Sequence, residues 1–512
     1  MKKRAIIIGA GPAGLSTACH LSDDIIPILI EKEDCVGGLS KTFFEDGNGT
    51  DIGPHRFFTK NQKVLDFWES LCPIQGAKAI DDILVNRQVS LKPDGPDPQI
   101  EDKVFLNRKR FSRIYYNKHF LDYPLKMKFS NISALGLIKT FVAGLSYIKS
   151  CIYKLPETNL ESFMINRFGR VLYELFFEGY TQKVWGVHPS QISKEWGMQR
   201  IKGISLIKVV LNALAKPFVK GKEISLTDEY YYPKWGSSQM WNLMAERIKE
   251  KGGEIILNSK VVELVKQDNK IVSVRVQNKN TGEIQEIFGD VFVSSMPVKS
   301  LLTNMNDVPQ NILDIANNLI YRDFILVNYV TEKINLKNNT DVPTVNNIAP
   351  DSWIYLQDND IKAGRLDIMN NFSPYIVKNF KDDFVINLEY FCNENDNFWS
   401  DTDENIINFG ISELEKLNVT EKARIKKSKV IRIKKAYPSY FGSYDKFDEL
   451  KSYLNSIDNL YCVGRNGQHK YNNMDHSVLS GIVASKIISN NEDKNVLWDV
   501  NTDSEYQETK LN

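Results

Sequence analysis

Arg4-Ala5-Ile6-Ile7-Ile8 runs directly into Gly9-Ala10-Gly11-Pro12-Ala13-Gly14 near the start of the chain, and this stretch decides the fold. An apolar run that ends in Gly-x-Gly-x-x-Gly predicts a strand, a tight turn and a helix, which open a doubly wound parallel sheet. Gly9 allows the turn, Gly11 lets a pyrophosphate approach the backbone, and Gly14 lets the helix pack closely against the strand. The free N–H groups of the helix N-terminus favour phosphate.

An acidic residue follows at the distance that this pattern requires. Glu31 ends the next apolar run, about twenty residues on, where a carboxylate can accept a hydrogen bond from a ribose hydroxyl. The order of strand, glycines, helix, strand and acid predicts a dinucleotide site. The alternative is a tight turn in an ordinary βαβ unit.

Composition limits the class of protein. The chain has 512 residues, of which 42% are hydrophobic and 25% are charged, as in a globular protein of roughly two to four domains. A net charge of +1 gives no reason to expect a nucleic-acid partner. The six cysteines are scattered without a Cys-x-x-Cys pair, so neither a disulfide framework nor a metal site is predicted. We expect reduced thiols and a cytoplasmic location.

The most apolar later stretch runs from Ile132 to Ile152. Lys139 and Lys149 lie inside it, and Gly136 and Gly144 interrupt it. A membrane-spanning helix needs about 20 residues that are largely free of charge. The stretch therefore predicts a buried or interfacial helix, and no transmembrane segment is expected.

The order of the predicted elements gives an α/β fold with a discontinuous Rossmann-like domain. Its three pieces are residues 1–90, 225–300 and 455–490. Apolar residues at three- and four-residue spacing predict a mainly helical insertion over 120–222. Strand-like runs predict a second domain with an antiparallel sheet over 301–454. Residues 491–512 are expected to form a loose polar tail.

Several further motifs carry a resemblance to a known family. They are Cys35-Val36-Gly37-Gly38-Leu39, Gly53-Pro54-His55-Arg56-Phe57, Gly179-Tyr180-Thr181-Gln182-Lys183-Val184-Trp185-Gly186 with Arg200, Tyr321-Arg322-Asp323 before a strand, and Gly464-Arg465-Asn466-Gly467 with Tyr471 and Met474-Asp475-His476-Ser477. Together they resemble the FAD-binding superfamily of amine oxidases, protoporphyrinogen oxidases and phytoene desaturases. The Gly-Pro-His element resembles the UDP-galactopyranose mutases within it. The resemblance extends from the first strand to about residue 490.

The resemblance implies a role for each motif. Residues implied in FAD binding are Gly9, Gly11, Gly14, Glu31, Gly37, Gly38, Leu39, Gly53, Pro54, His55, Val262, Gly464, Arg465, Asp475 and Ser477. Residues implied in catalysis are His55, which would lie near the reactive flavin N5, and Arg200 and Arg322, which would clamp a diphosphate. Residues implied in substrate binding are Tyr180, Trp185, Arg365, Tyr437 and Tyr471.

Ordinary structural roles are the alternatives for most of these side chains. Tyr180 and Trp185 could be core aromatics of a helical region, and the arginines could be solvated. Asp475 and Ser477 lie where a helix N-cap is expected, and capping alone would explain them. His55 could simply hold the Gly-Pro turn.

The mutase resemblance implies a reaction without net redox change. The reduced flavin N5 would attack the anomeric carbon of a nucleotide-diphosphate sugar, and pyranose and furanose forms would interconvert, as in surface polysaccharide biosynthesis. NAD(P)H could reduce the flavin. The rival hypothesis is an FAD-dependent oxidoreductase that takes a hydride from an amine, a porphyrinogen or a polyene. The segments Trp353-Ile354-Tyr355 and 387–391 resemble an uncharacterised, mutase-like branch of the superfamily more than the mutases themselves. The resemblance therefore leaves the sugar and the nucleotide open. The sequence also leaves open whether the protein is a monomer or a dimer.

Overall fold

The opening apolar run forms the central strand of a five-stranded parallel sheet. The computed structural model describes residues 2–123, 136–201 and 229–501. The strand order is β19 (Leu460–Cys462), β13 (Val291–Ser294), β1 (Lys3–Ile8), β2 (Ile25–Ile30) and β9 (Glu254–Ile256). Three separate parts of the chain supply these strands, so the prediction of a discontinuous α/β domain is confirmed.

Both faces of this parallel sheet are covered, which explains why its strands are mainly apolar. Ile7 and Leu29 face a core formed with α1 (Pro12–His20), α2 (Gln62–Leu71), α11 (Ser238–Glu250) and α18 (Met474–Asn490). Ile6 and Ile28 face a second core. That second core is closed by the antiparallel strands β10 (Ser259–Gln267), β11 (Lys270–Asn278) and β12 (Ile284–Phe288) and by α12 (Val298–Thr303), α13 (Gln310–Asn317) and α16 (Phe447–Ser456).

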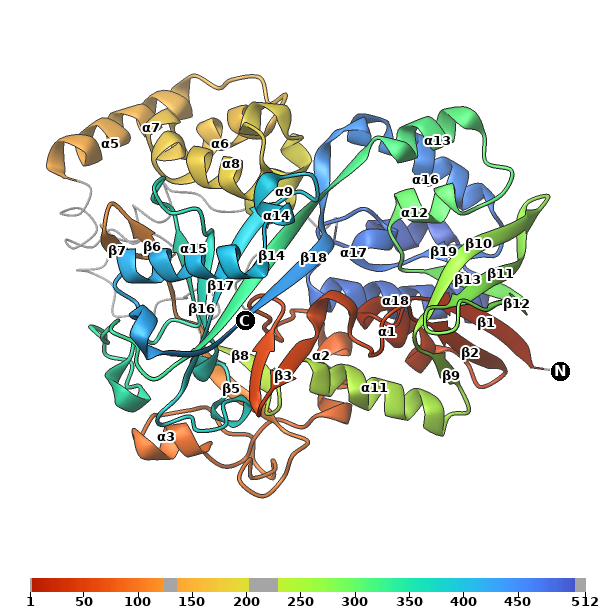
Figure 1. Ribbon diagram of the computed structural model, residues 1–512. Helices are drawn as coiled ribbons and strands as arrows, with labels where there is room; N and C mark the ends of the chain where they lie inside the picture. Colours follow the sequence, from red (N-terminus) through yellow and green to blue (C-terminus); the bar gives the residue numbers. More distant parts are fainter. Residues whose placement is uncertain (1, 124–135, 202–228, 502–512) are drawn as a thin grey trace.

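A seven-stranded sheet forms the second lobe (Figure 1). Its order is β18 (Ile425–Gly442), β14 (Leu319–Thr331), β17 (Phe384–Cys392), β16 (Arg365–Ile368), β15 (Trp353–Leu356), β6 (Ser112–Tyr116) and β7 (His119–Asp122), and only the β15–β6 pair is parallel among these described strands. The antiparallel sheet is as predicted, except that β6 and β7 join it from outside the expected range. The helix α15 (Asp403–Lys416) covers its apolar face, where Val327 and Leu388 are buried.

Smaller elements connect the lobes. The strand β5 (Phe105–Lys109) pairs with β8 (Glu229–Pro233), and β3 (Thr42–Glu45) pairs with β4 (Asn48–Asp51). The short helices are α3 (Ile80–Leu84), α14 (Asn397–Ser400) and α17 (Gly464–Gly467).

The helical insertion lies at one end of the seven-stranded sheet (Figure 1). It contains α5 (Leu137–Ile152), α6 (Leu160–Phe168), α7 (Arg170–Tyr173), α8 (Gly179–Trp185) and α9 (Lys194–Ile201). Residues 202–222 of the predicted insertion lie outside the described residues. Among the described residues, no helix has the length and apolar character needed to cross a membrane.

Two expectations about local structure are wrong. The start of the predicted polar tail is packed: Leu497 and Trp498 are buried, and the Trp498 indole donates to the Asn455 Oδ1 over 2.8 Å. Tyr321-Arg322-Asp323 does not precede a strand but lies inside β14, because the apolar run of that strand begins at Leu319.

Candidate functional site

The predicted dinucleotide turn has the geometry that its glycines require. Gly9 has a positive φ of 100°, and a methyl group at Gly14 would overlap the Gly9 carbonyl oxygen. Gly37 donates its N–H to the Ala10 carbonyl over 2.9 Å, which brings the second glycine pair against the first. A Cβ at Gly38 would lie 3.2 Å from the Gly11 Cα. This bare backbone at the start of α1 fits a pyrophosphate.

Glu31 is fixed beside that turn. Its carboxylate is buried and accepts the Ala10 N–H over 2.8 Å and the Glu33 N–H over 3.0 Å. These two bonds hold the side chain at the end of β2, where a ribose hydroxyl could also donate to it. Val262 lies at a bulge of β10, between the paired residues Val261 and Glu263. A contact of Val262 with the cofactor stays a prediction.

The closing motif reaches the same helix N-terminus from the other end of the chain. The Gly464 N–H donates to the Ser480 Oγ over 2.9 Å, and the Ser16 hydroxyl donates to the Val478 carbonyl over 2.7 Å, so α1 and α18 lie together. The cap of α18 is Asn473, whose N–H donates to His476 Nδ1 over 3.2 Å. Asp475 and Ser477 therefore lie inside the helix, and the expectation that they cap it is wrong.

Five aromatic side chains gather where the helical insertion meets the sheet. Tyr437 and Tyr471 stack with their ring centroids 5.5 Å apart, and Trp185 lies 6.4 and 6.3 Å from them. Tyr180 meets Tyr355 edge to face at 5.8 Å. Burial raises the pKa of Tyr180 and of Tyr437, so both keep a hydroxyl proton to donate. Leu39 packs against the same cluster as Trp185, Tyr437 and Tyr471.

The Arg465 guanidinium contacts this aromatic cluster. Its guanidinium donates to the Asn472 carbonyl over 2.8 Å and to the Ala436 carbonyl over 3.1 Å. The guanidinium carbon lies 5.4 Å from the Tyr437 ring centroid and 5.0 Å from the Tyr471 ring centroid. These contacts orient the stacked tyrosines; direct pairing of Arg465 with a cofactor stays a prediction.

The Gly-Pro-His segment crosses the polar face of the seven-stranded sheet. Gly53 has a φ of 85°, and a Cβ there would lie 3.1 Å from Glu389 Oε1. His55 Nδ1 lies 3.5 Å from Asp51 Oδ2, too far for a strong hydrogen bond. Asp51 is fully buried and accepts the hydroxyls of Thr42 over 2.5 Å and Tyr232 over 2.9 Å. The imidazole is thus placed beside a fixed carboxylate.

A buried polar group occupies that face of the sheet. Cross-strand pairing sets Arg365 opposite Glu389, and Asp367 opposite Asn387. The Arg365 Nε donates to Glu389 Oε2 over 2.7 Å, Nη2 donates to the same oxygen, and Nη2 also donates to the Tyr437 hydroxyl over 3.1 Å. Glu389 and Asp367 are fully buried.

Asp367 lies beside Glu389 in this buried group, and its surroundings shift its pKa. Burial and the neighbouring Glu389 raise the pKa of Asp367 well above its usual range, against the opposing effect of Arg365. The protonated form of Asp367 is therefore favoured to higher pH than in an ordinary aspartate. The Glu389 carboxylate and the Tyr437 phenol in turn raise the pKa of Arg365, despite its burial, so the guanidinium keeps its charge.

The other predicted arginines differ in position. The Arg322 Nε donates to the Val184 carbonyl over 2.9 Å and Nη2 donates to the Phe391 carbonyl over 3.3 Å, so this residue joins α8 to β17. Its direct contact with a substrate stays a prediction. Arg200 lies in α9, and its side chain lies outside the described residues.

Asp51, Asp367 and Glu389 were not among the predicted site residues. A signal for two of them is present in the sequence. Glu389 interrupts the strand Phe384–Cys392, in which every residue is buried, and Asp367 interrupts the short run Arg365–Ile368. A carboxyl in an apolar strand is rarely buried unless it is paired or functional.

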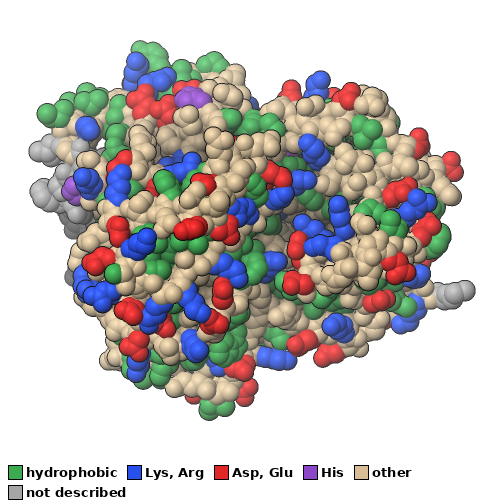
Figure 2. Space-filling model, viewed as in Figure 1, with side chains coloured by type: hydrophobic (Ala, Val, Ile, Leu, Met, Phe, Trp, Pro, Cys, Tyr) green, Lys and Arg blue, Asp and Glu red, His purple; other side chains and the backbone are tan. Residues whose placement is uncertain are grey.

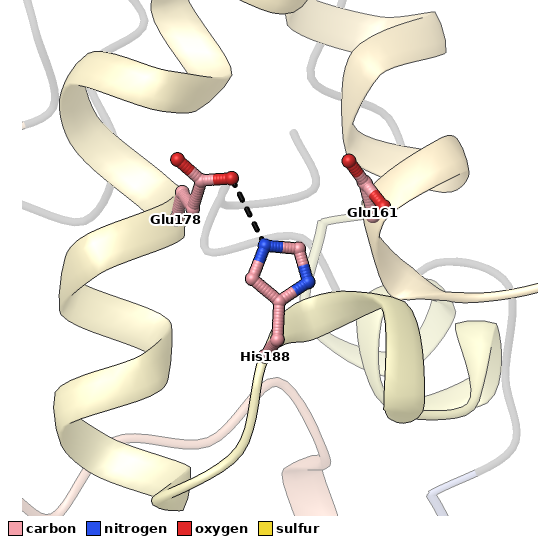
Figure 3. A group of neighbouring side chains, drawn as sticks. All are labelled: Glu161, Glu178 and His188. Carbon is pink, nitrogen blue, oxygen red and sulfur yellow. Dashed lines mark hydrogen bonds and ion pairs between the residues drawn. The ribbon is translucent and has the colours of Figure 1, made fainter.

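A separate group of possible metal ligands lies on the helical insertion. Glu161, Glu178 and His188 offer ligand atoms within 4.8 Å of one another, and Figure 3 shows them reaching together from different elements. His188 Nε2 lies 3.0 Å from Glu178 Oε1, and Nδ1 accepts the Ser190 N–H over 3.2 Å. These hydrogen bonds already give the imidazole a structural role, because they join Glu178 to the turn that contains Ser190.

Comparison with known proteins identifies relatives along nearly the whole chain. The model of the family described as flavin containing amine oxidoreductase matches residues 12–489. The chain is 26% identical to a 15-cis-phytoene desaturase of Synechococcus elongatus over 58% of either chain. It is 24% identical to that of Arabidopsis thaliana over 95% of this chain and 80% of the relative. A probable UDP-galactopyranose mutase of Klebsiella pneumoniae is 28% identical over 37% of this chain and 43% of the relative.

Solved structures share the fold. A reduced UDP-galactopyranose mutase matches with a TM-score of 0.75 at 19% identity, covering 100% of this chain and 99% of the other. A putative protoporphyrinogen oxidase from Exiguobacterium sp. 255-15 matches with a TM-score of 0.66 at 14% identity, covering 96% and 100%. Identities this low establish the architecture alone.

Proposed function

Because the chain belongs to the flavin-containing amine oxidoreductase family, we propose that its flavin is FAD and that it is a nucleotide-sugar mutase. The reaction would interconvert the pyranose and furanose forms of a sugar on a nucleoside diphosphate. The first relative is matched over only 58% of its length, and the assignment therefore rests on the site rather than on that relative.

The observation that carries the proposal is the buried polar group on the sheet. Arg365 and Glu389 lie beside Gly53, in the segment that the resemblance places against the flavin, and Asp367 follows two residues after Arg365 on the same strand. Burying such groups against a hydrocarbon substrate would be unfavourable. A sugar hydroxyl or a phosphate could bind Arg365, whose side chain is 16% exposed, while the fully buried Glu389 holds that arginine in place.

The glycine turn and Glu31 would hold the pyrophosphate and ribose of FAD, and the fit is good because the backbone is bare and the acid is fixed there. When bound and reduced, the flavin would supply a nucleophilic nitrogen for the anomeric carbon. The chain's own residues would position the substrate. Tyr437 and Tyr180 would donate hydrogen bonds to the substrate through their hydroxyl groups, and Trp185 would line the apolar side of the binding site.

Proton transfer is the second task that this site could perform. Opening and closing a sugar ring moves a proton between the ring oxygen and a hydroxyl. The raised pKa of Asp367 favours its protonated form, while the Glu389 carboxylate accepts hydrogen bonds from Arg365. The pair therefore offers an acid and an acceptor in one buried place. His55, 3.5 Å from Asp51, is a second side chain that could transfer a proton in this region.

The second candidate is a flavin-dependent oxidoreductase, and the sequence relatives favour it. The phytoene desaturases of Synechococcus elongatus and Arabidopsis thaliana match longer parts of the chain than the Klebsiella pneumoniae mutase does. The two hypotheses share the fold and the cofactor. They differ in the substrate that the polar group would contact.

An anaerobic assay separates the two. The FAD-loaded protein, oxidised or reduced with dithionite, is incubated with a panel of nucleotide sugars, and the products are separated by chromatography. The proposal expects an isomer of equal mass with reduced flavin only. Full turnover by oxidised flavin in air, or rapid flavin reduction by an amine or polyene with no sugar isomer, would overturn it.

A further inference from the structure

The helix α5 exposes its apolar side chains to solvent, whereas an ordinary surface helix buries them. Its large apolar side chains recur at three- and four-residue spacing on one stripe, and that stripe faces solvent. Ile138 is 82% exposed, Phe141 is 68% exposed and Ile152 is 68% exposed. The other members of the exposed stripe are Val142, Leu145 and Ile148. A surface helix normally turns such a stripe toward the core.

The opposite stripe of α5 is small and is fixed to the protein. Ala143 and Ser150 are buried, and the Ser146 hydroxyl accepts the Val171 N–H over 3.2 Å. The backbones also meet closely, because a Cβ at Gly169 would lie 2.8 Å from the Tyr147 Cα. The small residues therefore allow close packing on α6 and α7, and this contact holds the apolar stripe outward.

The charges along the helix have one sign. Residues 137–155 contain Lys139, Lys149 and Lys154 but no aspartate or glutamate. Lys139 and Lys149 are exposed, and Tyr153 and Leu155 extend the apolar surface past the helix end. Long lysine side chains can leave an apolar layer and reach anionic headgroups. Tyrosine is enriched at the interface between the headgroups and the apolar layer of a membrane.

The position of α5 in the fold suits a flat, extended surface. The helix lies at the outer edge of the insertion in Figure 1, and Figure 2 shows hydrophobic side chains at that edge. Sixteen residues span about 24 Å, which is shorter than the ~30 Å hydrocarbon core. The helix would thus lie along a membrane rather than cross it.

We propose that α5 docks the protein onto an anionic lipid bilayer, with its axis in the membrane plane. The stripe of Ile138, Phe141, Val142, Leu145, Ile148 and Ile152 enters the boundary between headgroups and acyl chains. Lys139 and Lys149 bind the headgroups. The inference does not depend on which reaction the flavin site performs.

Vesicle sedimentation tests the inference with the full FAD-loaded chain. One vesicle type contains phosphatidylcholine and phosphatidylglycerol, and the other contains phosphatidylcholine alone. We expect the protein to sediment with the first type and much less with the second. The double variant Phe141→Ser/Leu145→Ser should lower the partition coefficient by about a hundredfold, at roughly tenfold for each apolar side chain withdrawn.

The chain offers a matched control. Ile284 and Phe288 on β12 are 56% and 58% exposed and lie outside the helical insertion. Ile284→Ser/Phe288→Ser should leave vesicle binding unchanged. Lys139→Glu/Lys149→Glu should remove the preference for the anionic vesicles. Flavin content, measured on each variant, shows that the fold is kept.

Three results would overturn the inference. The protein could fail to sediment with either vesicle, or the Phe141 and Leu145 variant could bind as well as the parent. Analytical ultracentrifugation could also reveal a dimer that Phe141→Ser dissociates. In that case the apolar stripe would be an interface between two copies of the chain.

Discussion

Replacing Arg365 should lower the free energy of unfolding by an amount that can be estimated from the structure. Replacement by Met keeps the length of the side chain but removes the donors to Glu389 and to the Tyr437 hydroxyl. Glu389 is fully buried, so the variant would leave this carboxyl group without its ion-pair partner and without solvent. Breaking a buried ion pair in this way costs about 3–5 kcal/mol. We expect Arg365→Met to reduce the free energy of unfolding by that amount.

A double-mutant cycle isolates the pair. Glu389→Gln in the Arg365→Met background removes the stranded charge, so the double variant should be more stable than Arg365→Met alone by about 1–3 kcal/mol. Arg275→Met is the control, because Arg275 and Glu263 form an exposed pair with 2.8 Å between nitrogen and oxygen. Its effect should stay below about 1 kcal/mol.

The assay is urea unfolding followed by circular dichroism at a fixed excess of FAD, because bound ligand adds to apparent stability. Additive effects of the Arg365 and Glu389 changes would refute the reasoning. So would an Arg365→Met variant as stable as the Arg275→Met control.

Three further changes test the glycine turn, the carboxyl pair and the link to α8. Gly14→Ala would place a methyl group against the Gly9 carbonyl, so the purified variant should lack flavin absorbance. The raised pKa of Asp367 means that wild-type stability falls as pH rises from the unfolded value of about 4 through the folded pKa. Unfolding curves across pH should show that loss diminished in Asp367→Asn; an unchanged pH dependence would contradict it. Arg322→Ala removes the bonds to Val184 and Phe391, and titration calorimetry should show nucleotide-sugar affinity reduced about ten- to hundredfold with FAD retained; normal affinity would refute this.

The glycine turn and the parallel sheet could be predicted because local chemistry determines them. The spacing of Gly9, Gly11 and Gly14 after an apolar run has few structural solutions, and Glu31 follows on the next strand. The interruption of this domain by other segments could also be predicted, because the short apolar runs that form its strands lie in three separated parts of the sequence.

The pairing of Arg365 with Glu389 could not be predicted. It depends on the register between β16 and β17, and a shift of one residue would send every side chain to the other face. The burial of Arg322 depends in the same way on tertiary contacts, since its partners are backbone carbonyls of α8 and β17. The cap of α18 was misplaced for a smaller reason: Asn473 and Asp475 are both good cap residues, and sequence alone does not choose between them.

The contrast between the two faces of the seven-stranded sheet bears most directly on function. The face under α15 is mainly apolar, with Val327 and Leu388 in its core, as stability alone would favour. The opposite face carries Arg365, Asp367 and Glu389, which stability alone would disfavour, since apolar replacements of buried ion pairs are often more stable. The α15 face also holds a buried pair, Arg113 with Asp351, at the β6 end of the sheet, but the opposite face gathers two carboxyl groups around one arginine, and we attribute this cluster to a polar ligand on that face. If nucleotide sugars fail to bind there while an apolar substrate does, this explanation fails with the mutase hypothesis.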